Sequence, residues 1–133
     1  MNKKSFTRVA GALTITAGLA FAMTVPAQAS HGGGGVEHSG QCSAGSVWKL
    51  KAKADDGQIE VAAEIDSNVV GQVWKWKISD NGPAVANGTS TTQAPSGSFS
   101  VNRIVANQAG TDKFVLKAST ASTGETCKGK VTL

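Results

Sequence analysis

Histidine is scarce in this sequence: only His31 and His38 are present, and both lie in a glycine-rich segment near the start of the chain. Acyl transfer by a serine or cysteine nucleophile needs an imidazole held within hydrogen-bond reach of that nucleophile. A flexible glycine-rich segment does not hold an imidazole in this way. The sequence therefore argues against a Ser–His–Asp or Cys–His hydrolase.

Cysteine is equally scarce, since Cys42 and Cys127 are the only two, and the sequence has no Cys-x-x-Cys pair and no phosphate-cradling glycine loop. In an exported protein an even pair indicates one disulfide, with two free thiols as the alternative. The two cysteines are 85 residues apart. A bridge that closes a loop of this length is expected to stabilise the fold by roughly 4–5 kcal/mol on the chain-entropy account.

The sequence also lacks a sustained helical period and a converging pair of carboxylates. A glycosidase needs two acids that face each other across a cleft. Glu60, Glu64 and Asp66 instead alternate along one predicted strand, on the outside of a hairpin and beside lysines. We therefore expect a protein without catalytic residues and without a cofactor.

Residues 1–29 have the pattern of a secretory signal peptide. Three basic residues precede an apolar run over Val9–Val25, and a small-x-small motif ends at Ala29. An uncleaved membrane anchor is the alternative, but the many small residues of the run and the cleavage motif favour removal. Cleavage after Ala29 predicts a secreted, extracellular protein that makes no membrane contact.

Removal of this leader changes the charge of the protein. Three of the 13 lysines and arginines lie in it, whereas all nine acidic residues follow it, so the net charge falls from +4 to +1. A basic partner surface must then depend on how the lysines are distributed rather than on their total. We expect no nucleic-acid partner and a monomeric protein.

Residues 30–41 contain four consecutive glycines and are predicted to be a flexible linker. With a new amino terminus at Ser30, the segment offers His31, Glu37 and His38 as ligands for Cu(II), Ni(II) or Zn(II). No rigid scaffold would hold these groups, so a linker that merely contains histidine is the alternative. Titration of Cu(II) into the protein and into a variant without the two histidines separates the two interpretations.

The strongest structural signal is the turn Asp56-Gly57, which lies between two runs of alternating apolar and polar residues. Folding the chain at this turn sets the register of a hairpin and brings apolar residues opposite each other on one face. The expected apolar pairs are Ala54 with Ile59, Ala52 with Val61, Leu50 with Ala63 and Trp48 with Ile65. On the other face the expected pairs are Lys53 with Glu60 and Lys49 with Glu64.

The segment Gln72 to Ser79 alternates in the same way, with Trp74, Trp76 and Ile78 on one side and two lysines on the other. A period of two with aromatic residues is typical of a strand. The face that carries the lysines cannot be the buried one, because an unpaired buried charge costs several kcal/mol. The two tryptophans are therefore predicted to lie inward, in the core.

Further strands are expected over residues 84–92, 98–105 and 113–119, with a last strand from Cys127 to Leu133. Together with the hairpin and the tryptophan strand they make seven. Seven short strands separated by turns predict a single all-β sandwich domain over residues 42–133.

Two features of this pattern resemble the immunoglobulin and fibronectin-III-like superfamily: a tryptophan on the third strand and the corner from Gly110 to Phe114 before the sixth. The runs Ser96–Phe99 and Gly124–Cys127 look more specifically like small secreted Ig-like proteins of Gram-positive bacteria. The resemblance implies a seven-stranded Ig-like antiparallel β-sandwich, in which the third, sixth and seventh strands share a sheet. The bridge would staple the two ends of the domain instead of joining the second and sixth strands, and the resemblance implies no function.

The lysines of the third, sixth and seventh strands would then share the outer face of one sheet, with no acid among them. The other sheet balances Lys49 and Lys53 against Glu60 and Glu64. Anionic wall polymers, acidic polysaccharides or another extracellular protein would be the natural partners of such a basic face. The alternative is that these lysines only keep the sheet soluble. The predicted basic residues are Lys75, Lys77, Lys113, Lys117, Lys128 and Lys130.

A carbohydrate-binding module is the other functional alternative. Trp74 and Trp76, two residues apart on one strand, would form a flat platform for sugar rings if they were exposed. The exposure of these two side chains therefore decides between a core and a platform.

Overall fold

The structure is a computed structural model that describes residues 35–133. The predicted leader, its cleavage site and His31 lie outside the described residues. Within residues 35–133 no helix forms, and so none that could cross a membrane. The strands are β1 (Val36–Gln41), β2 (Val47–Asp55), β3 (Gln58–Asp66), β4 (Val73–Asp80), β5 (Ala84–Thr91), β6 (Ser98–Ala106), β7 (Lys113–Ser119) and β8 (Thr126–Thr132).

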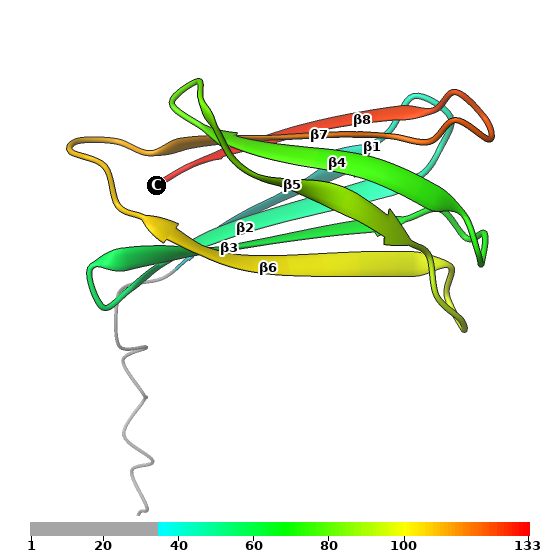
Figure 1. The fold of residues 1–133 in the computed structure, drawn as a ribbon, viewed down its shortest axis with the longest axis horizontal. Helices are drawn as coiled ribbons and strands as arrows, with labels where there is room; N and C mark the ends of the chain where they lie inside the picture. The colour runs from blue at the N-terminus through cyan, green and yellow to red at the C-terminus, as the bar shows by residue number, and fades with distance from the viewer. Residues whose placement is uncertain (1–34) are drawn as a thin grey trace, which may run out of the picture.

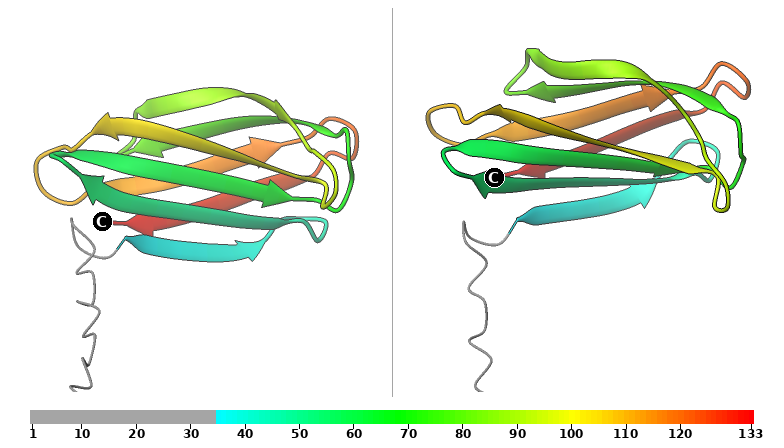
Figure 2. Two further views of the ribbon diagram at one scale, coloured as in Figure 1. Left: turned by 90° about the horizontal axis from the view of Figure 1, so that it is seen from below. Right: turned by 60° about the horizontal axis from the view of Figure 1, so that its bottom comes forward.

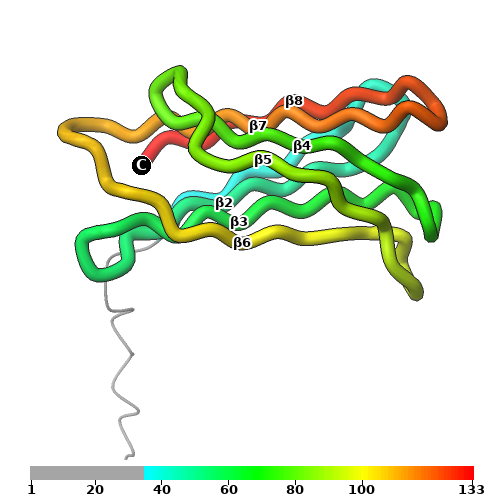
Figure 3. The backbone as a smooth tube through the Cα atoms, in the orientation of Figure 1, coloured from blue at the N-terminus to red at the C-terminus, as the bar shows by residue number. Residues whose placement is uncertain are grey.

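The strands form two antiparallel sheets, in the orders β1-β2-β3-β6 and β5-β4-β7-β8, which lie face to face (Figure 1). The predicted all-β sandwich is therefore confirmed, with eight strands instead of the seven expected. The neighbours β4, β7 and β8 are the third, sixth and seventh strands of the expected set, so their placement in one sheet is also confirmed. The loop over residues 107–112 carries the chain from β6 in one layer to β7 in the other (Figure 3).

The hairpin of β2 and β3 has the predicted register, with Ala54 opposite Ile59 and Trp48 opposite Ile65. Asp56 and Gly57 have positive φ angles of 47° and 78°. A two-residue turn with positive φ at both positions matches the twist of the flanking strands, which explains why this dipeptide sets the register.

The predicted linker over residues 30–41 is wrong for its second half. Val36–Gln41 forms β1, which pairs with β2 along its full length and lies beside β8 (Figure 2). The segment has no apolar alternation because it is an edge strand with one neighbour in its sheet. It is held by backbone pairing, by the packing of Val36 on the core and by a hydrogen bond from His38 Nδ1 to the carbonyl oxygen of Lys130 (3.1 Å).

The core lies between the sheets, and the tryptophans of β4 are at its centre. Trp74 is fully buried and Trp76 is 4% exposed. Each indole N–H is satisfied inside the sandwich, since Trp74 donates to Gln72 Oε1 (2.9 Å) and Trp76 donates to Ser90 Oγ (3.0 Å). The inward orientation predicted for both side chains is confirmed.

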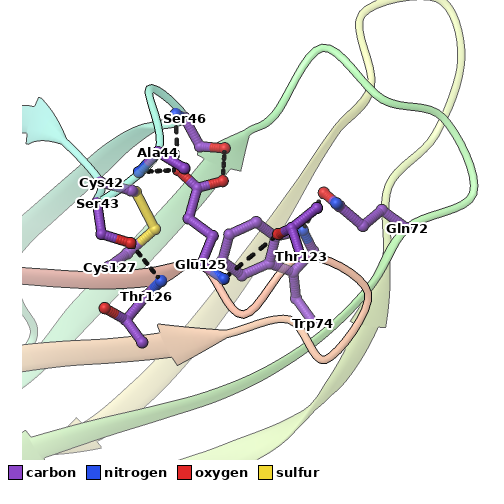
Figure 4. The surroundings of a disulfide bond; sticks show 10 residues. All are labelled: Cys42, Ser43, Ala44, Ser46, Gln72, Trp74, Thr123, Glu125, Thr126 and Cys127. Atoms are coloured by element: carbon purple, nitrogen blue, oxygen red, sulfur yellow. Dashed lines mark hydrogen bonds between the residues drawn. A yellow bond between two sulfur atoms is a disulfide. The ribbon is translucent and has the colours of Figure 1, made fainter.

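The predicted disulfide is present and joins the segment after β1 to β8, with Cα atoms 4.4 Å apart (Figure 4). Beside it, the carboxylate of Glu125 accepts hydrogen bonds from the backbone N–H groups of Ala44 and Ser46 (both 2.9 Å) and from the Ser46 hydroxyl (2.5 Å). Burial alone would raise the pKa of Glu125, but these hydrogen bonds hold it below its ordinary value. This end of the sandwich is thus joined by a covalent and a polar contact.

A second buried acid, Asp80, lies at the end of β4. It is fully buried, faces Asp112, and neither of its carboxylate oxygens has a hydrogen-bond partner among the described residues. Burial first, and then the neighbouring Asp112, raise the pKa of Asp80 to about 6. The Asp112 backbone is in turn tied to Leu133 by two hydrogen bonds (2.9 and 3.0 Å), so the acid pair lies where β4, the 107–112 loop and the end of β8 meet.

Candidate binding surface

The outward positions of β4, β7 and β8 carry a group of lysines that we call the lysine face. Alternation along each strand places one set of side chains in the core and leaves the lysines exposed on the outer face, which also carries Val73 and Val115. No acidic residue occupies an outward position on these three strands. All the predicted lysines belong to this face: Lys75, Lys77, Lys113, Lys117, Lys128 and Lys130.

Three of these lysines form a row across the sheet, because Lys77 lies directly opposite Lys117, and Lys117 lies directly opposite Lys128. Like charges directly opposite each other on neighbouring strands destabilise a sheet. Nothing in the sequence pattern requires this arrangement, since serine or threonine serves equally well at an exposed strand position. The row therefore concentrates positive charge that an anion can neutralise.

A shallow hollow lies along this row. Its volume is about 450 Å³. Its walls include Lys75 and the three lysines of the row, together with the hydroxyl-bearing residues Ser119 and Thr126. An ammonium group is a compact, hydrated point charge, and a hydroxyl can donate or accept a hydrogen bond. The hollow is thus suited to phosphate, sulfate or carboxylate groups along a polymer.

The acids of the protein are gathered elsewhere. Asp80, Asp112 and Glu125 are buried. The other six lie on the β1-β2-β3-β6 sheet and its hairpin turn. This sheet also carries four basic side chains, so its net charge is slightly negative and not balanced as expected. Glu37, which lies opposite Lys51, was missed because its strand was taken for linker. The two sheets therefore carry net charges of opposite sign.

The tryptophan platform expected of a carbohydrate-binding module is wrong for Trp74 and Trp76. Both are buried, as the core requires, and the Trp76 ring is covered from the β6 side by Arg103, whose guanidinium carbon is 5.2 Å from the ring centroid. A sugar cannot reach either ring without opening the sandwich.

The candidate metal ligands are only partly within the described residues. His38 lies on β1 and uses Nδ1 in its hydrogen bond to Lys130, so it belongs to a sheet edge and not to a free linker. Because a carbonyl oxygen only accepts, Nδ1 carries the hydrogen. Among residues 35–133 no three potential ligands of histidine, cysteine or carboxylate type come together around a common point.

A second hollow, of about 630 Å³, lies along the outer edge of β8 where this strand faces β1. Sequence reasoning missed it, because it is formed by residues far apart in the chain. Its lining residues are His38, Ser39, Trp48, Val115, Lys128 and Lys130.

No protein-family model, no curated protein and no solved structure matches this chain.

Proposed function

We propose that this protein is an exported, non-catalytic binding domain, and that it contacts anionic polymers of the extracellular space through the lysine face. The observation that carries this proposal is the row Lys77, Lys117 and Lys128, in which three like charges face each other on adjacent strands. Export is supported by the leader pattern, and the buried disulfide fits an oxidising compartment.

The mode of binding follows from the shape of the surface. The sheet is open and only shallowly hollowed, so it supplies point charges in register and no enclosed pocket for a small molecule. Strands in a sheet lie about 4.8 Å apart, so the row presents positive charges at the spacing of neighbouring strands. A polymer with repeated negative charges can engage several of these lysines at once, and each added contact raises the affinity.

Cosedimentation with bacterial cell walls at low ionic strength tests the proposal. The variant replaces the row by Lys77→Gln, Lys117→Gln and Lys128→Gln, which removes three charges and keeps the length of the side chains. We expect the wild type to sediment with the walls and this variant to lose most of its binding, by about tenfold or more in affinity.

The matched control is Lys49→Gln, Lys51→Gln and Lys53→Gln, which removes the same number of charges from β2 in the other sheet. The control is expected to bind within about twofold of the wild type, since net charge alone is not the cause. Equal loss in both variants would show a non-specific charge effect. A wild type that does not bind would show that the lysines only keep the sheet soluble.

A further inference from the structure

Trp48 differs from the two buried tryptophans in its surroundings. It points inward from β2, as predicted, but it lies at the side of the sandwich where β1 and β8 meet, and it is only partly buried. Within residues 35–133 its indole N–H finds no acceptor, whereas those of Trp74 and Trp76 each find one. One aromatic side chain therefore keeps an accessible surface at the side of the sandwich.

Two glycines hold the Trp48 ring in place. A Cβ atom on Gly40 of β1 would lie 2.9 Å from ring atoms of Trp48, and one on Gly129 of β8 would come closer still. Side chains at these two positions would displace the ring, so their absence lets β1 and β8 approach it with bare backbone. The ring is thus fixed before any ligand arrives, and a fixed aromatic surface loses little entropy on binding.

The second hollow, along the edge of β8 beside Trp48, is continuous with the lysine face; we call it the groove. Its walls include Lys128 and Lys130, and Lys128 also lines the hollow along the lysine row. Val115 and His38 also line this space beside the indole. A polymer that follows the row from Lys77 to Lys128 therefore reaches the Trp48 ring as it crosses the edge of β8.

The combination of the lysine row with the indole of Trp48 selects among anionic polymers. A row of lysines alone serves a polyphosphate and a polyuronate equally well, since both offer only charge to it. An indole flanked by lysines favours a ligand with an apolar ring face and a negative substituent on the same unit, because the ring face packs on the indole while the anion meets an ammonium group. A pyranose that carries a carboxylate has both features.

We infer that the groove between β1 and β8 is the sugar-binding part of the lysine face, and that its ligand is an acidic polysaccharide whose uronic acid unit packs on Trp48 while its carboxylate lies against Lys128 and Lys130. This inference rests on the proposed function and names the class of polymer. The tether of β1 to Lys130 through His38 holds the two walls of the groove together.

Quenching of tryptophan fluorescence by acrylamide tests the inference on the unmodified protein. Acrylamide is uncharged and reaches Trp48, whereas Trp74 and Trp76 are buried. Polygalacturonate is expected to protect Trp48 and to lower the quenching slope by about half. Linear polyphosphate, which has no ring, is expected to bind, as followed by ultrafiltration, without protecting the indole.

The variant Trp48→Leu keeps an apolar side chain at the edge of the core and removes the aromatic surface. It is expected to lose about tenfold in affinity for polygalacturonate and to stay within about twofold of the wild type for polyphosphate. Should this variant not fold, the quenching of the wild type decides alone.

The outcomes separate the two proposals. If neither polymer binds, the proposed function fails and the inference fails with it. If both polymers bind but polygalacturonate leaves the quenching slope unchanged, the lysine face stands and the sugar-binding groove is overturned. Equal protection by dextran, a neutral polysaccharide, would overturn the requirement for an acidic unit.

Discussion

At the scale of single residues, Trp76 shows how one side chain is committed to the core. It is 4% exposed, its N–H is bonded to Ser90, and Arg103 of β6 lies over its ring. Trp76→Ala would remove these contacts and leave a cavity, so we expect the free energy of unfolding to fall by about 3–5 kcal/mol. Urea denaturation measures the change.

Val73→Ala is the matched control on the same strand, because Val73 is 52% exposed on the outer face. Its effect is expected to be about 0.5 kcal/mol or less. A Trp76→Ala variant as stable as this control would contradict the core position of the ring.

Asp80 is the residue whose ionisation works against the fold. Its pKa is raised to about 6 in the folded protein and is near 3.8 in the unfolded chain, so the folded state binds the proton more tightly. The contribution of protonated Asp80 to the stability of the fold is therefore complete below about pH 4 and is lost as the pH rises through about 6. We expect the free energy of unfolding to decrease over this window by about 1–3 kcal/mol.

Asp80→Asn removes this ionisation and is expected to flatten the stability profile between pH 4 and pH 7, as measured by urea denaturation at a series of pH values. Glu125 affects stability in the opposite direction and at lower pH. Because its pKa is lowered in the folded protein, its contribution to stability is lost only when the pH falls below the ordinary pKa range of a glutamate. A wild-type profile that rises between pH 4 and pH 7 would contradict the assignment to Asp80.

At the scale of elements, the hairpin of β2 and β3 could be predicted in full. The turn dipeptide fixes two positive φ angles, and the alternation on both sides leaves one register in which the inward apolar residues face one another. The same alternation placed the tryptophans of β4 inward and its lysines outward. Local patterns suffice here because each strand has one buried face and one exposed face.

The strand β1 could not be predicted for the opposite reason. Apart from Val36, its residues are polar or glycine, and its position depends on the open edge of β2 and on Lys130 of β8, which is remote in sequence. Gly40 weakens a strand on propensity, yet the close approach of Trp48 requires it. A glycine that is needed for packing looks like a glycine of a linker.

Shortening the chain distinguishes a strand from a linker. A protein that begins at Cys42 lacks β1, so it loses six residues of backbone pairing and the packing of Val36. We expect its free energy of unfolding to fall by about 2–4 kcal/mol relative to a chain that begins at Gly35, which keeps every residue of β1. Equal stability of the two chains in urea would contradict the strand.

At the scale of the whole molecule, the main feature is the separation of charge between the two sheets. The outward position of each lysine followed from alternation, but their adjacency required the strand order that the resemblance implied, in which β4, β7 and β8 are neighbours. The groove at Trp48 could not be foreseen, because it depends on the contact of β2 with Gly129 at the far end of the chain. In the sequence, only Gly40 and Gly129, which lie against the Trp48 ring, point to this groove.

The central claim is that the lysine face binds anionic polymers by charge, and the salt dependence of binding tests it most directly. The dissociation constant for polygalacturonate is measured by fluorescence anisotropy from about 0.05 to 0.5 M NaCl, a range over which screening of exposed charges becomes strong. We predict that affinity falls steeply with salt, and that the slope is clearly smaller for the variant without Lys77, Lys117 and Lys128. The slope of the control without Lys49, Lys51 and Lys53 should match that of the wild type. Binding that does not change with salt, or equal slopes for the two variants, would contradict the claim.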